Sequence, residues 1–139
     1  MKGEQTIRLP SSSRRPTSAS MFRVTPFARV AFWSAVILAL VMALLPHPPN
    51  LPLNPSDKIQ HAAAFIVLTV LALIAYPRVS PLGIGVALLG FGASIEFFQL
   101  IPTLHRDAQL ADWYVDAAAI AAVLLPAALL RRLPGVSRS

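Results

Sequence analysis

Charged and amide side chains interrupt an otherwise apolar sequence at three places, where they could bind a polar ligand or move protons. The pairs at positions 57 and 61, 96 and 99, and 112 and 116 are three or four residues apart, a spacing that puts each pair on one face of a helix. A charge held in or near hydrocarbon is costly, and it usually serves function or pairs with a neighbour. The candidate ligand-binding residues are Asp57, Lys58, His61, Glu96, Gln99, Arg106, Asp112 and Asp116.

The composition excludes several classes of protein. Of the 139 residues, 55% are hydrophobic and 13% are charged, whereas soluble domains are about 25% charged. The chain has no cysteine, which excludes disulfides, thiolate metal sites and cysteine nucleophiles. The net charge is +6, but the basic residues flank apolar runs and are not interleaved with aromatic residues. Membrane lipid headgroups are therefore the expected partner, and nucleic acid is not.

Four apolar runs predict an all-α fold, a polytopic membrane bundle of four transmembrane helices. Each run has the ~20 residues that a helix needs to cross a ~30 Å hydrocarbon core, where the backbone must form its hydrogen bonds within the segment. Glycines in the third run and alanines in the fourth permit close approach, which predicts that these two helices pack together. The predicted spans are residues 27–45, 59–76, 82–101 and 111–130.

The predicted four-helix membrane domain, residues 27–132, is flanked by two polar segments. Residues 1–26 contain the low-complexity run SSSRRPTSAS and predict a disordered, basic cytoplasmic tail, and residues 133–139 predict a short cytoplasmic tail. A secretory signal peptide is the alternative for the N-terminal segment, because a basic region precedes an apolar run. The run at 27–45 is longer than a signal core of roughly 7–15 residues, which favours a retained membrane anchor.

The distribution of basic residues predicts the orientation. With four spans, both termini lie on one side of the membrane. Of the 12 Lys and Arg residues, only Lys58 and Arg106 fall on the opposite side, and cytoplasmic segments carry the excess of positive charge. Both termini are therefore expected in the cytoplasm. The first and third connections, and with them all the candidate polar residues, should face the non-cytoplasmic side.

At these residues the chain resembles the VanZ-like family of small membrane proteins. The resemblance lies in residues 57–77, 92–102 and 106–116, and the family pattern looks like Asp-Lys-x-x-His-x-x-x-Phe, Glu-x-x-Gln and Arg-x5-Asp-x3-Asn-x2-Gly. Asp116 stands where the family usually has Asn, which makes the site more acidic, and Ala119 where it usually has Gly. The residues that fit the pattern are Asp57, Lys58, His61, Phe65, Glu96, Gln99, Arg106 and Asp112.

The resemblance implies a four-span protein of the bacterial cytoplasmic (inner) membrane. The family is named for a factor that raises resistance to the glycopeptide teicoplanin. The resemblance does not define a biochemical activity, and many members lie outside resistance clusters. The resemblance therefore leaves open whether this chain affects glycopeptide resistance.

Two classes of function fit the polar residues, and binding is the first. The site would recognise an anionic lipid, a lipid-linked cell-wall precursor or a glycopeptide-type ligand. Lys58 and Arg106 would hold an anionic group such as phosphate, with a two-pronged contact from the arginine. Glu96, Gln99 and Asp112 would orient these basic groups or bind polar atoms of the ligand.

The second class is a membrane enzyme that acts on a phosphate- or acyl-bearing lipid. His61 would be the general base or nucleophile, and Glu96 or Asp112 would act as the acid or tune the histidine. No nucleophile or cofactor motif is visible, which favours the non-enzymatic hypothesis and predicts no cofactor. These residues and Asp116 are suitable metal ligands, but no tight motif such as His-x3-His is present, so no metal is predicted.

Transport is a weaker third hypothesis. The inner half of every predicted span is apolar, and four spans are few for a path through a single chain. A transport function would therefore require a homo-oligomer.

Overall fold

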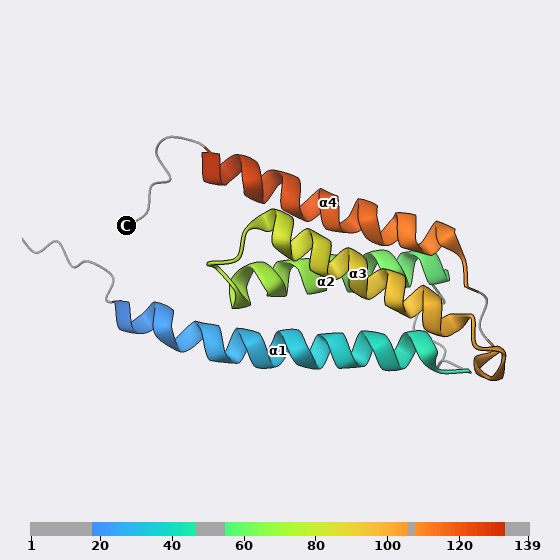
Figure 1. Cartoon of the computed structure of the whole chain (residues 1–139). Helices are drawn as coiled ribbons and strands as arrows, with labels where there is room; N and C mark the ends of the chain where they lie inside the picture. Colours follow the sequence, from blue (N-terminus) through green and yellow to red (C-terminus); the bar gives the residue numbers. More distant parts are fainter. Residues whose placement is uncertain (1–17, 47–54, 106–107, 133–139) are drawn as a thin grey trace, which may run out of the picture.

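The computed structural model describes residues 18–46, 55–105 and 108–132. Within these ranges the chain is all-helical and contains no β-strand, so the predicted all-α fold is confirmed. The elements are α1 (Ser18–Leu44), α2 (Asp57–Ala75), α3 (Pro81–Gln99), the short 3-10 helix η1 (Pro102–Leu104) and α4 (Leu110–Arg132) (Figure 1).

Four helices in the described part of the chain are long and apolar enough to cross a membrane. Their outer surfaces carry large apolar side chains, such as Leu82, which is 77% exposed, and Leu125, which is 64% exposed. Apolar surface of this extent suits contact with lipid or with another protein, not with water. By the length and composition of its helices, the chain is a multi-pass membrane protein.

The helix boundaries agree with the predicted spans except at the start of α1. The other three helices begin and end within two residues of the predictions. Helix α1 begins at Ser18, so the end of the predicted disordered tail is helical instead. Hydrophobicity marks only the segment that can lie in lipid, whereas helical hydrogen bonds can continue into polar sequence. The rest of the two predicted tails, residues 1–17 and 133–139, lies outside the described residues.

The helices run antiparallel to their neighbours in sequence, and α1 and α4 lie on opposite sides of the α2–α3 pair (Figure 1). This topology brings the last turns of α1 and α3 to the same end of the bundle as the first turns of α2 and α4. We call this the polar end, because it carries the described candidate residues from position 57 to position 116. The opposite end carries Arg29, Arg78, Arg131 and Arg132.

Close contacts fix how α3 packs on α4. A Cβ atom added at Gly85 would lie 3.0 Å from Leu124 Cδ1, and one added at Gly92 would lie 2.8 Å from Asp116 Oδ2. Trp113 of α4 also donates a hydrogen bond of 3.1 Å from its indole nitrogen to the Leu89 carbonyl of α3. The predicted packing of these two helices is therefore confirmed. Helices α2 and α3 each contact the other three long helices, and so this pair forms the centre of the bundle.

Candidate functional site

The first turns of α2 place Lys58 and His61 at the polar end. The helix begins at Asp57, directly after Ser56, whose side chain makes no capping hydrogen bond. An acidic residue in the first turn is favoured by the helix dipole, which accounts for the exposed Asp57 without a role in a site. One turn later, His61 points between the helices, and its side chain is only 10% exposed.

His61 pairs with Asp116 of α4. The His61 Nδ1 and Asp116 Oδ1 atoms are 3.1 Å apart, and the Asp116 side chain is fully buried. A carboxylate oxygen accepts hydrogen bonds, so the ring nitrogen Nδ1 is the donor in this contact. In a neutral imidazole this leaves the lone pair of Nε2 as the acceptor or ligand atom.

Glu96 reaches the site from the last turns of α3. Its side chain is buried, with 8% of the residue exposed, and its Oε2 atom accepts a hydrogen bond of 2.8 Å from the Gln109 backbone N–H. Gln109 directly precedes α4, where backbone N–H groups have no partner within the helix. The start of α4 therefore holds one oxygen of Glu96, while the other oxygen has no hydrogen-bond partner among the described residues.

Asp112 lies in the first turn of α4 and is 5% exposed. Its Oδ1 atom is 3.7 Å from the Lys58 ammonium, which forms the only ion pair with a lysine or arginine in the part of the chain that the structure describes. The Lys58 side chain is half-exposed and also donates a long hydrogen bond of 3.5 Å to the Gln109 side-chain oxygen. Lys58 is therefore the solvent-exposed member of the site.

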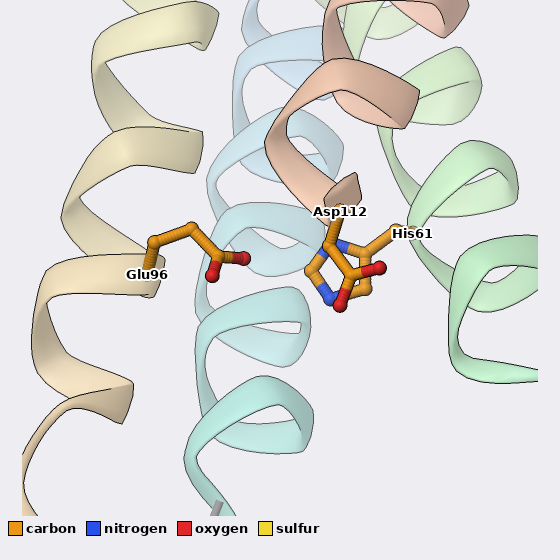
Figure 2. Close-up of side chains that lie close together, drawn as sticks. All are labelled: His61, Glu96 and Asp112. Atoms are coloured by element: carbon orange, nitrogen blue, oxygen red, sulfur yellow. The ribbon is translucent and has the colours of Figure 1, made fainter. Parts of the chain in front are cut away.

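Three helices thus bring His61, Glu96 and Asp112 together, with one potential ligand atom of each within 4.8 Å of the others. Figure 2 shows the Glu96 carboxylate extending from α3 toward the His61 ring of α2 and the Asp112 carboxylate of α4. We call these three residues, with Lys58 and Asp116, the polar cluster. It contains three buried carboxylates, one imidazole and one half-exposed ammonium.

Of the remaining predicted residues, Gln99 and Asp57 lie outside the polar cluster. Gln99 is buried, but its amide donates a hydrogen bond of 2.9 Å to the Ala43 carbonyl and so ties α3 to the last turn of α1. Asp57 is exposed, and its side chain makes no hydrogen bond or ion pair within the described residues. Arg106, which was expected to hold an anionic group, lies outside the described residues.

Gln109 and Gly92 contribute to the site, although neither belongs to a polar pair in the sequence. The one sequence signal for Gln109 is its position directly before the fourth apolar run, where a helix presents free N–H groups. Gly92 leaves the space that the Asp116 carboxylate and the Phe65 ring occupy. A glycine at position 92 is only a weak sequence signal for a site, because glycines are common in membrane helices.

A partly open pocket adjoins the polar cluster between α1, α2 and α3. Its lining has an apolar part, which we call the apolar wall, and a polar part, and the His61 side chain belongs to both the pocket and the cluster. A molecule with a polar head and an apolar chain would match such a lining. The apolar wall consists of Ala39, Met42, Ala43, Ala64, Phe65 and Ile95, and the polar part of Asp57, Gln60 and His61.

The arrangement supports three kinds of chemistry. Buried carboxylates can bind a cation, accept hydrogen bonds from hydroxyl or amine groups, or exchange protons with the imidazole. The half-exposed ammonium can contact an anionic group as a point charge. Comparison of the chain with family models, with curated proteins and with solved structures found no match. A function for the site is therefore proposed from its geometry.

Proposed function

We propose that this chain is a VanZ-like protein of the bacterial cytoplasmic membrane that binds the headgroup of an anionic lipid or lipid-linked envelope precursor. The observation that carries the proposal is the convergence of His61, Glu96 and Asp112 within 4.8 Å from three different helices. Each belongs to a different block of the family pattern, and Lys58 of the first block lies beside them. Convergence of separate blocks on one site supports both the resemblance and a shared role.

In this proposal the polar end faces the non-cytoplasmic side. Lys58 is the only lysine or arginine at that end among the described residues, whereas Arg29, Arg78, Arg131 and Arg132 lie at the other end. Cytoplasmic ends carry the excess of Lys and Arg. Arg29 also donates a hydrogen bond of 3.3 Å to the Ala75 carbonyl at the end of α2, where a cation is favoured by the helix dipole.

The ligand chemistry follows from the groups at the polar end. The Lys58 ammonium would contact a phosphate, and the carboxylates of the cluster would accept hydrogen bonds from hydroxyl or amine groups of the same head. The apolar wall of the pocket would hold the adjoining part of the lipid chain. A headgroup with both a phosphate and hydrogen-bond donors fits this combination.

Mass spectrometry of co-purified lipids tests the proposal. We expect the wild-type protein to retain one species well above its share of the membrane, and the Glu96→Gln variant to lose it. The substitution removes a buried charge but keeps the size of the side chain, so the loss would report on binding and not on packing. Ser94→Ala is the matched control, because Ser94 is exposed on the same helix and its hydroxyl only donates a hydrogen bond to the Gly90 carbonyl of that helix.

The same lipid profile in all three proteins, each folded, would contradict the proposal. The cluster would then be a network that holds α2, α3 and α4 together. Circular dichroism and gel filtration in detergent establish that the compared proteins are folded.

One observation favours an enzyme as the second candidate. The buried Asp116 carboxylate orients His61 through Nδ1 and leaves Nε2 directed away from it, which is how a carboxylate positions a general base. The substrate would be a phosphate- or acyl-bearing lipid. In that case His61→Gln would abolish turnover of the co-purified lipid while binding remained, whereas a binding protein shows no turnover in either form.

A further inference from the structure

The charges of the polar cluster do not balance among the described residues. Three carboxylates are buried, and the nearest lysine or arginine that the structure describes is the half-exposed Lys58, 3.7 Å from Asp112. Even with a positive charge on His61 beside Asp116, one negative charge would stay uncompensated. Uncompensated charge in a buried site is costly, and such sites either pair their charges or bind metal ions.

Three buried oxygen atoms without a hydrogen-bond partner also indicate a missing positive charge. Glu96 Oε1, Asp112 Oδ1 and Asp116 Oδ2 are buried and have no hydrogen-bond partner among the described residues. The first two belong to residues that are more than nine-tenths buried and that meet at the cluster. Buried polar atoms in native proteins almost always have a partner. Among the described residues, Asp112 Oδ1 has only the Lys58 ammonium at 3.7 Å, and Glu96 Oε1 has no partner, so a positively charged group between them would satisfy both.

We propose that His61, Glu96 and Asp112 form a site for a divalent metal ion of the Zn²⁺ or Mn²⁺ type. One imidazole and two carboxylates are ligands that these ions accept. Ligand atoms about 2.1 Å from a tetrahedral ion lie roughly 3.4 Å from each other. The three candidate atoms already lie within 4.8 Å of one another, so small side-chain rotations would bring them to the ion (Figure 2).

Asp116 is the positioning residue of this site. By accepting from Nδ1 at 3.1 Å, it fixes the tautomer and the ring orientation that present Nε2 as the ligand atom. Metal-binding histidines almost always donate their second nitrogen to a carboxylate, carbonyl or water. In this pair His61 therefore has the arrangement of a metal ligand, and Asp116 that of the carboxylate that orients it.

The ion would also complete the charge balance. Its two positive charges and that of Lys58 equal the three negative charges of the carboxylates, with His61 neutral. Three protein ligands leave a coordination position open, as in catalytic zinc sites. A phosphate oxygen could occupy that position, which would explain how an acidic cluster binds an anionic headgroup. Metal binding itself does not depend on the lipid proposal.

Metal titration of the purified protein tests the site. Tag-free protein in detergent is stripped with a chelator, titrated with Zn²⁺ or Mn²⁺, and analysed for bound metal by inductively coupled plasma mass spectrometry. We expect one ion per chain in the wild type, and none at the same concentration in Glu96→Gln or Asp112→Asn. Asp116→Asn should weaken binding by about 10- to 100-fold, as loss of a supporting carboxylate does. Ser94→Ala, which alters an exposed side chain on the same helix as Glu96, should bind as the wild type does.

A wild-type measurement keeps the test independent of how the variants fold. The X-ray absorption spectrum of the zinc-loaded protein should show one imidazole nitrogen among oxygen ligands. A spectrum without imidazole, or unchanged metal binding in Glu96→Gln, would overturn the proposal. Absence of stoichiometric binding would also overturn it, and a proton or the Arg106 guanidinium would then supply the missing charge. Lipid co-purification could persist in that case, which separates the two proposals.

Discussion

Replacing His61 by leucine should destabilise the metal-free protein by about 3–5 kcal/mol, the usual cost of breaking a buried charged pair. The reason is the Asp116 carboxylate, which is fully buried and loses its 3.1 Å partner. The free energy of unfolding can be measured by titration with sodium dodecyl sulfate in mixed micelles, with a chelator present. The chelator separates this effect from any loss of bound metal.

A second substitution makes this prediction specific to the pair. The double variant His61→Leu with Asp116→Asn should be more stable than His61→Leu alone, because the amide carries no charge and leaves only an unsatisfied polar group, which costs about 1–3 kcal/mol. Additive losses, or a double variant less stable than the single one, would show that the pair is not coupled. Asp116→Asn alone also places in this chain the residue that the VanZ-like pattern usually has there.

Replacing Gly92 by alanine should cost about 1–3 kcal/mol and weaken the site, because an added methyl group overpacks a filled core. The new Cβ atom would lie 2.8 Å from Asp116 Oδ2 and 3.3 Å from Phe65 Cζ. Asp116 cannot move away without giving up His61, and Phe65 is 1% exposed. The free energy of unfolding and the retention of lipid should therefore fall together.

Gly90→Ala is the matched control for this substitution. Gly90 lies on the same helix, and a Cβ atom added there would meet nothing within 4 Å. The variant should unfold with wild-type stability or slightly above it, because alanine favours a helix more than glycine does. Equal losses in the two variants would mean that helix α3 does not pack against Asp116 in the way described.

The fold could be predicted from the sequence because hydrocarbon leaves the backbone few choices. Four apolar runs of sufficient length have to form helices in a membrane, and the helices α2, α3 and α4 lie within two residues of the predicted spans. The start of α1 at Ser18 was not predictable by this route, because hydrophobicity says nothing about helical residues beyond the lipid.

The site could be predicted only in part, because spacing along a helix does not show which neighbour a face meets. Glu96 and Gln99 were expected to act together, but three residues in a helix leave their directions about 60° apart. Glu96 therefore meets α4, whereas Gln99 meets α1. The contacts of His61 with Asp116, and of Glu96 with Gln109, depend on the packing of three helices.

The same limit explains why no metal site was predicted. Metal motifs that can be recognised in a sequence place two ligands on one helix, as His-x3-His does. In this chain each candidate ligand comes from a different helix, so the three are neighbours only in the folded bundle. The imidazole and carboxylates were recognisable as suitable ligand types, but their mutual distances were not.

Labelling of single cysteines tests most directly the claim that the polar end opens to the non-cytoplasmic side. The chain has no cysteine of its own, so Thr103→Cys and Val79→Cys each carry a unique thiol. Both residues are exposed, Thr103 in η1 at the polar end and Val79 between α2 and α3 at the opposite end (Figure 1). A membrane-impermeant maleimide should label Thr103→Cys in intact cells and Val79→Cys only after permeabilisation. The reverse pattern would place the polar cluster in the cytoplasm and contradict the proposed binding of an envelope precursor.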